Sequence, residues 1–260
     1  GMGELLARTP LDHEQHEFVD NMRICAENLL VIINDILDFA KIEAGMLPIV
    51  PGEVSLPKLI EQAEGIFTEQ AQKKDLSLMV ITSGLPELVR TDGGRIMQIL
   101  VNLLGNALKF TTSGEVSLSV HGSFADEEKS RVNVAFAVRD TGIGIDPSRH
   151  EQIFASFEQA DGTLTRQYGG TGLGLTIANN LVRLLGGQGI QVRSEPHRGS
   201  TFFFGLSFDV LSETVSLESV QSAADPAVPR FEGLRVLAAE DNPFNRALLQ
   251  KMLASLFIGR

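Results

Sequence analysis

The stretch NLLGNALKF, residues 102–110, combines an apolar helical pattern with polar residues along one edge. Asn102, Asn106 and Lys109 stand at positions i, i+4 and i+7, so they share one face of a predicted helix. Two carboxamides and an ammonium on a mostly apolar helix would be costly to bury without partners. Either they form a hydrogen-bonded structural trio, or they hold a metal ion and phosphate, because an Asn carbonyl can coordinate Mg²⁺.

Two glycine-rich stretches accompany this helix, DTGIGID at 140–146 and YGGTGLGLTIA at 168–178. Glycine lets backbone N–H groups come close to a ligand. The second stretch runs directly into a predicted helix, whose N-terminus can bind phosphate. Neither stretch is a P-loop, since no Gly-Lys-Ser/Thr follows, and each taken alone is also typical of an ordinary turn.

The surrounding residues predict a mixture of helices and strands without regular alternation. This pattern favours an α+β fold: a two-layer α/β sandwich whose mixed, mostly antiparallel sheet carries helices on one face. We expect helices at 58–73, 93–110 and 171–185, and strands at 76–81, 115–124, 131–139, 189–194 and 201–208.

Residues 12–44 predict a single long helix before this domain. Asp12 and Gln15 form a candidate capping box, and Gly45 is a candidate stop. The heptad spacing of its apolar residues favours a bundle seam, which needs a hairpin partner, a second chain or both, over the core helix of one globule. The seam consists of Phe18, Met22, Cys25, Leu29, Ile32, Ile36 and Phe39.

The composition excludes some classes of partner. The chain has 22 basic and 33 acidic residues, a net charge of -11, which argues against nucleic acid or an anionic membrane surface as partner. A single cysteine fits a reducing cytoplasm. The sequence contains no apolar run long enough to span a membrane and no signal-peptide pattern, so we expect membrane contact only through parts absent from this chain. Gly1-Met2 is interpreted as a cloning remnant.

Changes in composition along the chain predict four regions. Residues 1–46 form part of a helical hairpin, and residues 47–210 form the mixed domain. Residues 211–230 are rich in Ser, Ala, Glu and Pro and form a linker. Residues 231–260 predict one strand and one helix, too little for a core, and therefore the first fragment of another domain.

Four stretches in this order closely resemble the sequence boxes of sensor histidine kinases, which belong to the ATP-binding group that includes gyrase, Hsp90 and MutL. NLLGNALKF resembles the N box, DTGIGID and YGGTGLGL resemble the glycine boxes, and IFASFEQ, residues 153–159, resembles the phenylalanine box. INDILDFAKIEAG, residues 33–45, resembles the second helix of the dimerisation and phosphotransfer hairpin. LRVLAAEDNPFNR, residues 234–246, resembles the start of a receiver domain, so the whole resembles part of a hybrid kinase.

The resemblance implies ATP and Mg²⁺ as ligands. Asn106 would bind the Mg²⁺ that bridges the ATP phosphates, with Asn102 supporting it, and Lys109 would contact phosphate oxygens. Asp140 would accept a hydrogen bond from the adenine amino group. The remaining residues of the first glycine box, Gly142 and Gly144, would let the backbone pass beside the base.

The resemblance also implies a lid over the nucleotide at 158–170. Phe154 and Phe157 would anchor it, and Arg166 within it would contact the γ-phosphate. The start of the following helix would cradle phosphates through Gly170, Thr171, Gly172, Leu173 and Gly174. In the receiver-like fragment, Glu240 and Asp241 resemble Mg²⁺-binding acids of a site that is incomplete here.

One position separates phosphoryl transfer from hydrolysis within this group. In the gyrase and Hsp90 relatives a glutamate one turn before the metal-binding asparagine activates water, whereas this position is Asn102, which is no base at neutral pH. We therefore expect a protein histidine kinase. The alternatives are an ATP-hydrolysing relative and a nucleotide-binding regulatory module without kinase activity.

The stretch ELLARTPLDHEQHEF, residues 4–18, only superficially resembles the family's phosphoacceptor box. Its Arg-Thr-Pro falls in a turn between two helices, so we expect the acceptor histidine upstream of Gly1 and no autophosphorylation of this fragment. The expected partners are a second copy, forming a homodimer through the helix at 12–44, and receiver or histidine-phosphotransfer domains. The expected location is the cytoplasmic portion of a sensor kinase.

Overall fold

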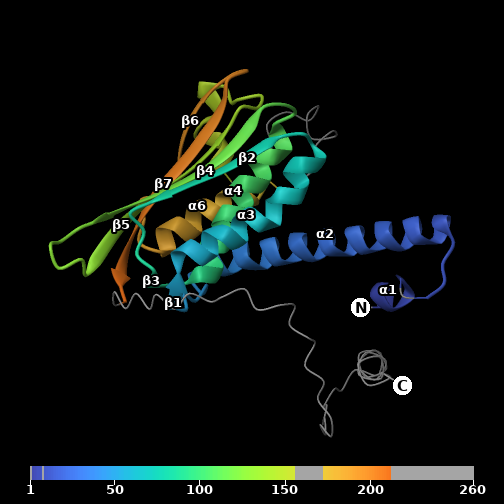
Figure 1. Ribbon diagram of the computed structural model, residues 1–260, viewed down its shortest axis with the longest axis horizontal. Coiled ribbons are helices and arrows are strands. Elements are labelled where there is room, and N and C mark those ends of the chain that lie inside the picture. The colour runs from blue at the N-terminus through green and yellow to red at the C-terminus, as the bar shows by residue number, and fades with distance from the viewer. Residues whose placement is uncertain (1, 8, 156–171, 212–260) are drawn as a thin grey trace, which may run out of the picture. The chain divides into compact units, whose positions relative to one another are not determined.

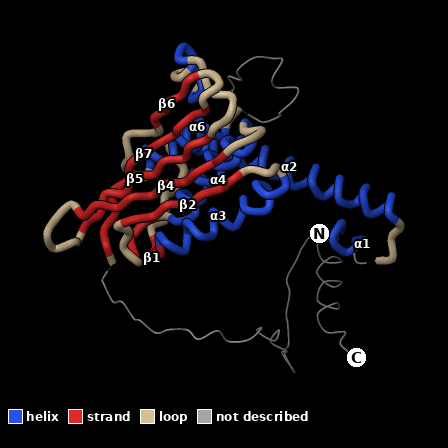
Figure 2. Tube along the Cα trace, turned by 45° about the horizontal axis from the view of Figure 1, so that its top comes forward, coloured by secondary structure: helices blue, strands red, loops and turns tan. Residues whose placement is uncertain are grey.

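The structure, a computed structural model, describes residues 2–7, 9–155 and 172–211 (Figures 1 and 2). Contacts between residues divide the described chain after Val31, and the parts on either side form separate compact units. The long helix α2, His13–Glu43, crosses this boundary.

The first unit contains the short helix α1, Met2–Ala7, and the beginning of α2. Between them, the backbone N–H and the hydroxyl of Thr9 both donate to the carbonyl oxygen of Leu6, at 3.0 and 2.7 Å. The predicted capping box is confirmed, since Asp12 Oδ1 accepts from the Gln15 N–H at 2.8 Å and Gln15 Oε1 accepts from the Asp12 N–H at 3.1 Å. Residues 9–12 therefore connect two helices, as the sequence predicts.

The C-terminal end of α2 is closed as the sequence predicts. Gly45 has a φ of 65°, and its N–H donates to the Ile42 carbonyl at 2.9 Å. The Met46 N–H donates to the Lys41 carbonyl at 2.8 Å. These two bonds form a Schellman motif, which satisfies carbonyl groups of the last turn and ends the helix.

The second unit is built on one sheet of seven strands, in which the order β1-β3-β7-β5-β4-β2 is continuous and β6 pairs with β7. Every pair is antiparallel except β2 with β4, which confirms the mostly antiparallel sheet. The sequence did not predict β1 or β3, which have only four residues each. The strands are β1 Gly52–Ser55, β2 Ser77–Ser83, β3 Leu88–Thr91, β4 Glu115–Phe124, β5 Arg131–Asp140, β6 Gln191–Glu195 and β7 Gly199–Val210.

Three helices cover one face of this sheet, as expected: α3 Leu56–Lys73, α4 Gly93–Phe110 and α6 Gly174–Leu184 (Figures 1 and 2). The structure begins α6 three residues later than the sequence predicted. Two short 3₁₀ turns, Pro147–Arg149 and Gln152–Phe154, follow β5.

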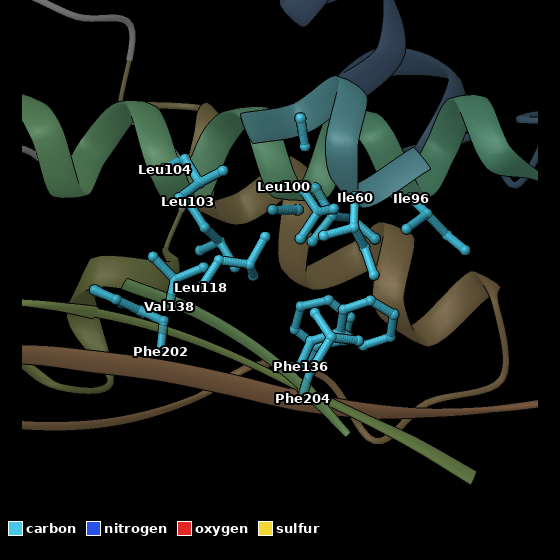
Figure 3. Close-up of a cluster of buried hydrophobic side chains, with 14 of the residues drawn as sticks. Ile60, Ile96, Leu100, Leu103, Leu104, Leu118, Phe136, Val138, Phe202 and Phe204 are labelled. Atoms are coloured by element: carbon cyan, nitrogen blue, oxygen red, sulfur yellow. The ribbon is translucent and has the colours of Figure 1, made fainter. Parts of the chain in front are cut away.

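The core lies between the helices and the sheet (Figure 3). On the sheet, the rings of Phe136 and Phe204 stack with centroids 4.8 Å apart. Leu100 and Leu103 of α4 and Ile60 of α3 lie opposite them and are almost fully buried. Because each such side chain contributes about 1.5–3 kcal/mol on burial, this layer fixes α4 firmly on the sheet.

GGQGIQVRSEPHRGS, residues 186–200, has one extra residue near Gly189 compared with the sensor histidine kinase pattern that the chain resembles, which predicts a bulge at the start of the following strand. This bulge is absent. β6 pairs with β7 in unbroken register from Gln191↔Phe203 to Glu195↔Gly199. The connection at 186–190 precedes this pairing, and there the Ile190 N–H donates to Asn179 Oδ1 at 2.8 Å. Residues without cross-strand partners accommodate an extra residue more readily than a paired strand does, so the loop takes it up.

The last turns of α2 belong to the second unit and pack on its core. Phe39 and Ile42 contact its core. Asp38 Oδ2 accepts hydrogen bonds from Arg95 Nη1 and Gln98 Nε2 of α4, both at 2.9 Å. Within the described part of the chain, no helix combines the length and apolar character needed to cross a membrane.

Candidate functional site

Helix α4 carries three of the predicted site residues along one edge. Asp92 caps the helix, since its Oδ1 accepts from the Arg95 N–H at 3.1 Å. Asn102, Asn106 and Lys109 are half-buried and lie within about 60° of one another around the helix axis. The apolar residues face the core: Ile96, Ile99, Leu100, Leu103, Leu104, Ala107 and Leu108. The same amphipathic pattern that builds the core therefore leaves the polar edge at its boundary.

The C-terminal end of α4 concentrates positive charge. Burial lowers the pKa of Lys109, whose Nζ lies 4.9 Å from the centroid of the Phe110 ring. Lys74 Nζ donates to the Leu108 carbonyl at 2.8 Å, where a cation also complements the helix dipole. A nearby anion would favour the charged form of Lys109, so this end of α4 suits a phosphate contact.

Asp140 ends β5 and is the one charged residue among the buried side chains of the described chain, with only 5% of its surface exposed. Burial raises the pKa of its carboxyl group, and hydrogen bonds from Gly142 and Ser200 partly oppose that rise. The Gly142 N–H donates to Asp140 Oδ1 at 2.8 Å. A buried carboxylate with a raised pKa is typical of functional sites.

The loop after Asp140 runs close to other backbone segments. A Cβ on Gly142 would fall 2.4 Å from the carbonyl oxygen of Phe110, and the next residue, Ile143, donates its N–H to the same oxygen at 3.3 Å. Gly144 has a φ of 69°, and a Cβ there would fall 1.9 Å from the Glu195 carbonyl oxygen. Only glycine fits positions 142 and 144 without displacing backbone atoms. The close approach of Gly142 and the hydrogen bond from Ile143 place the loop against the end of α4.

The start of α6 lies against the polar edge of α4. A Cβ on Gly174 would fall 2.7 Å from Asn102 Oδ1. The N-cap residue, Leu173, gives the first turn no side-chain cap, and first-turn backbone N–H groups are the groups with which a helix binds an anion. Gly172, just before it, has a φ of 70°. The second glycine box thus meets the helix that carries Asn102, Asn106 and Lys109.

Phe154 is the part of the phenylalanine box that the structure describes. It is half-buried at the edge of the core, and its carbonyl oxygen accepts from the Thr176 hydroxyl of α6 at 3.0 Å. The predicted site residues Phe157, Arg166, Gly170 and Thr171 lie outside the described residues, as do Glu240 and Asp241.

Two serines at the site were missed by the sequence analysis. Ser200 of β7 hydrogen-bonds to the Asp140 carboxyl through both its backbone and its side chain. Ser194 of β6 accepts from the Ile145 N–H at 2.7 Å. The glycine and serine of RGSTF, residues 198–202, were the available sequence signal for Ser200. The local pattern could not show their pairing with β5, because that contact joins residues far apart in the sequence. Among the described side chains, no group of three or more His, Cys, Asp or Glu residues could hold a metal ion by itself.

The part of the chain from the end of β3 to the end of β7 matches a known family of domains. Residues 91–210 match the family model described as histidine kinase-, DNA gyrase B-, and HSP90-like ATPase. Residues 1–45 match the model of the His Kinase A (phospho-acceptor) domain. With this pair of domains and the similarities that follow, the chain belongs to the histidine kinases.

Curated relatives resemble nearly the whole chain. It is 39% identical to the autoinducer 2 sensor kinase/phosphatase LuxQ of Vibrio cholerae over 253 residues, 96% of this chain and 29% of the relative. It is 38% identical to hybrid signal transduction histidine kinase B of Dictyostelium discoideum over 223 residues, 85% of this chain and 11% of the relative. The chain thus spans less than a third of the length of these relatives.

A solved structure resembles both the sequence and the fold. The crystal structure of full-length ShkA in complex with AMPPNP is 34% identical, with a TM-score of 0.65, and the match covers 81% of this chain and 42% of ShkA. The α+β class and the helix preceding the sheet domain agree with this likeness.

Proposed function

We propose that this chain binds Mg-ATP and transfers the γ-phosphate to a histidine side chain, as the catalytic region of a hybrid sensor kinase. The observation that carries the proposal is that α4 contacts both glycine boxes. Its last residue, Phe110, meets Gly142 and Ile143, and its Asn102 meets Gly174. The polar edge of α4, the buried Asp140 and the N-terminus of α6 therefore surround one region.

Each residue has a role that its chemistry supports. Asp140 accepts a hydrogen bond from the adenine amino group, and the loop with Gly142 and Gly144 passes beside the base. Lys109 contacts phosphate oxygens at the C-terminal end of α4. The remaining roles are those implied by the sequence: Phe154 and Phe157 anchor the lid, Arg166 contacts the γ-phosphate, and residues 170–174 cradle the phosphates.

The described residues fit a magnesium ion bound together with ATP. Asn106 offers an amide oxygen on the half-buried edge of α4, while no acidic cluster of the described chain could bind the ion without the phosphates. Mg²⁺ prefers this arrangement of few protein ligands, several waters and substrate phosphates. When bound, the ion would neutralise charge on the phosphate oxygens. Asn102, one turn earlier, would support Asn106.

Transfer to a side chain is favoured over hydrolysis at this site. The position of the water-activating glutamate of the gyrase and Hsp90 relatives is Asn102, whose amide cannot accept the proton of water at neutral pH. In the transfer, an imidazole nitrogen attacks the γ-phosphorus, the bond between this phosphorus and the β,γ-bridging oxygen breaks, and ADP leaves. The imidazole proton passes to solvent. Positioning and charge neutralisation supply most of the catalysis.

The partners in this proposal are a second copy of the chain and a receiver or histidine-phosphotransfer domain. The seam of α2 supports the dimer, because Phe18, Met22, Leu29 and Ile36 are all at least 48% exposed. A helix with such an apolar stripe is stabilised by burying it against another helix. We further propose that residues 231–260 begin a receiver domain whose Mg²⁺-binding acids are Glu240 and Asp241.

The proposal is tested by measuring the affinity for AMPPNP by isothermal titration calorimetry, with Mg²⁺ and with EDTA. Asn106→Ala should remove the Mg²⁺-dependent part of the affinity, about ten- to hundredfold, because it deletes a contact to a charged ligand. Asn133→Ala makes the same chemical change at the other end of β5, where Asn133 Oδ1 accepts from the Ser207 hydroxyl at 2.6 Å, and should leave the affinity unchanged. Unchanged Mg²⁺-dependent affinity in Asn106→Ala would refute the proposed site.

A further inference from the structure

Ser194 connects three backbone segments around the candidate base-binding loop. Its Oγ accepts a hydrogen bond from the Ile145 N–H at 2.7 Å. It lies 2.8 Å from the Gly199 carbonyl oxygen and 3.0 Å from the hydroxyl oxygen of Ser200. A serine hydroxyl has one proton, which this half-buried group can donate either to the Gly199 carbonyl or to the Ser200 oxygen while it accepts from Ile145.

The network reaches Asp140 through Ser200. Ser200 pairs with Asp140 across β5 and β7, and its side chain hydrogen-bonds to the Asp140 carboxyl. When Ser194 donates to Ser200 and Ser200 donates to the carboxyl group, a series of hydrogen bonds runs from the Ile145 backbone through both serines to Asp140. The two ends of the glycine-box loop are joined by these serine hydroxyls.

The turn between β6 and β7 holds the same loop from the other side. The His197 N–H donates to the Ile143 carbonyl at 2.7 Å. Gly144 packs so closely on Glu195 that a Cβ would fall 1.9 Å from the Glu195 carbonyl oxygen. Ser194 adds a side-chain bond to these backbone contacts. An alanine at position 194 would leave the Ile145 N–H without this acceptor, and the loop would lose a fixed point.

We propose that Ser194 is a positioning residue for adenine recognition, which keeps the 140–145 loop and the Asp140 carboxylate in their relative places. This inference rests on the proposed binding of ATP at this site. Ser194 itself need not touch the nucleotide. It acts through Ser200 on the carboxylate and through Ile145 on the loop beside the base.

The test compares affinities for ATP and inosine triphosphate, which carries an oxygen in place of the adenine amino group. Both are measured with Mg²⁺ by calorimetry. Ser194→Ala should weaken ATP binding about fivefold, as expected for one misaligned hydrogen bond, and change inosine triphosphate binding much less. Ser207→Ala is the matched control on β7, about 20 Å along the strand from Ser200, and should change neither affinity.

A second pair of variants separates the hydroxyl from the fold. Ser194→Thr and Ser194→Val have nearly the same shape, and only the first keeps the hydroxyl. Ser194→Thr should retain the preference for ATP, and Ser194→Val should lose it as Ser194→Ala does. If Ser194→Ala does not fold, this pair alone decides the question.

Two results would overturn the inference: equal weakening of both nucleotides, as a merely structural role predicts, or wild-type selectivity in both Ser194→Ala and Ser194→Val. The proposed function fails separately, and the inference with it, if the wild-type protein does not bind Mg-ATP in the same assay.

Discussion

Gly142→Ala tests the close approach between the first glycine box and α4. A Cβ at this position would fall 2.4 Å from the carbonyl oxygen of Phe110 and 2.9 Å from its carbonyl carbon. Ordinary van der Waals contact begins at 3.4 Å, and both atoms belong to the backbone of a packed helix. The loop must therefore move by about 1 Å, because a core-packed helix resists displacement more than a loop does.

The displacement of the loop lowers the unfolding free energy because it disturbs two hydrogen bonds. It stretches the hydrogen bond from the Ile143 N–H to Phe110, now 3.3 Å, and moves the Gly142 N–H away from Asp140 Oδ1, now 2.8 Å. Overpacking and the loss of these bonds should cost about 2 kcal/mol of unfolding free energy. For a domain of this size, that lowers the melting temperature by about 4–8 °C. The misplaced Asp140 should weaken nucleotide binding at least about tenfold.

Thermal unfolding followed by circular dichroism, together with calorimetric titration of AMPPNP, measures both effects. Gly65→Ala is the control, since Gly65 lies in α3 with no atom within 4 Å of an added Cβ. That change should stabilise the protein by up to about 1 kcal/mol through helix propensity and leave the affinity intact. The reasoning would be refuted if Gly142→Ala matched the wild-type protein in both melting temperature and affinity.

Three further predictions concern the helix α2 and the buried acid. Asp38→Ala should lower the unfolding free energy by about 2 kcal/mol in a denaturant titration, because it leaves the largely buried Arg95 without its carboxylate, whereas the exposed Glu69→Ala should change nothing measurable. Burial raises the pKa of Asp140, so on acidification its carboxylate takes up a proton at a pH above the usual 3.8. Because a charged carboxylate is a stronger acceptor for the adenine amino group than a neutral carboxyl group, NMR titrations should show adenosine affinity falling as the pH is lowered through that raised value, and an affinity independent of pH across the protonation of Asp140 would contradict this assignment. Ile36→Glu introduces charge into an exposed apolar face, so analytical ultracentrifugation should show dissociation of the proposed homodimer, and an unchanged mass would exclude this face as the interface.

The long, strongly patterned elements were predictable. The bounds of α4 and β4 agree residue for residue with the sequence prediction, and α2 differs by one residue at each end. The strands β1 and β3 were missed because four residues show too little alternation to indicate a strand, and their pairing with each other joins residues more than 30 positions apart. The bulge was predicted wrongly because the extra residue was assigned to a strand, while the sheet register begins only at Gln191.

The sequence by itself determined the helix periodicity, the capping residues and the four boxes, because these are encoded within a few turns of the chain. It also placed Asn102, Asn106 and Lys109 on one edge, since the helical repeat alone requires this. Only the tertiary structure decided that Asp140 is buried beside Ser200, and that Ser194 bonds to Ile145. The physical reason is that these contacts join residues about 50–60 positions apart, and sheet register and helix packing, not local pattern, bring them together.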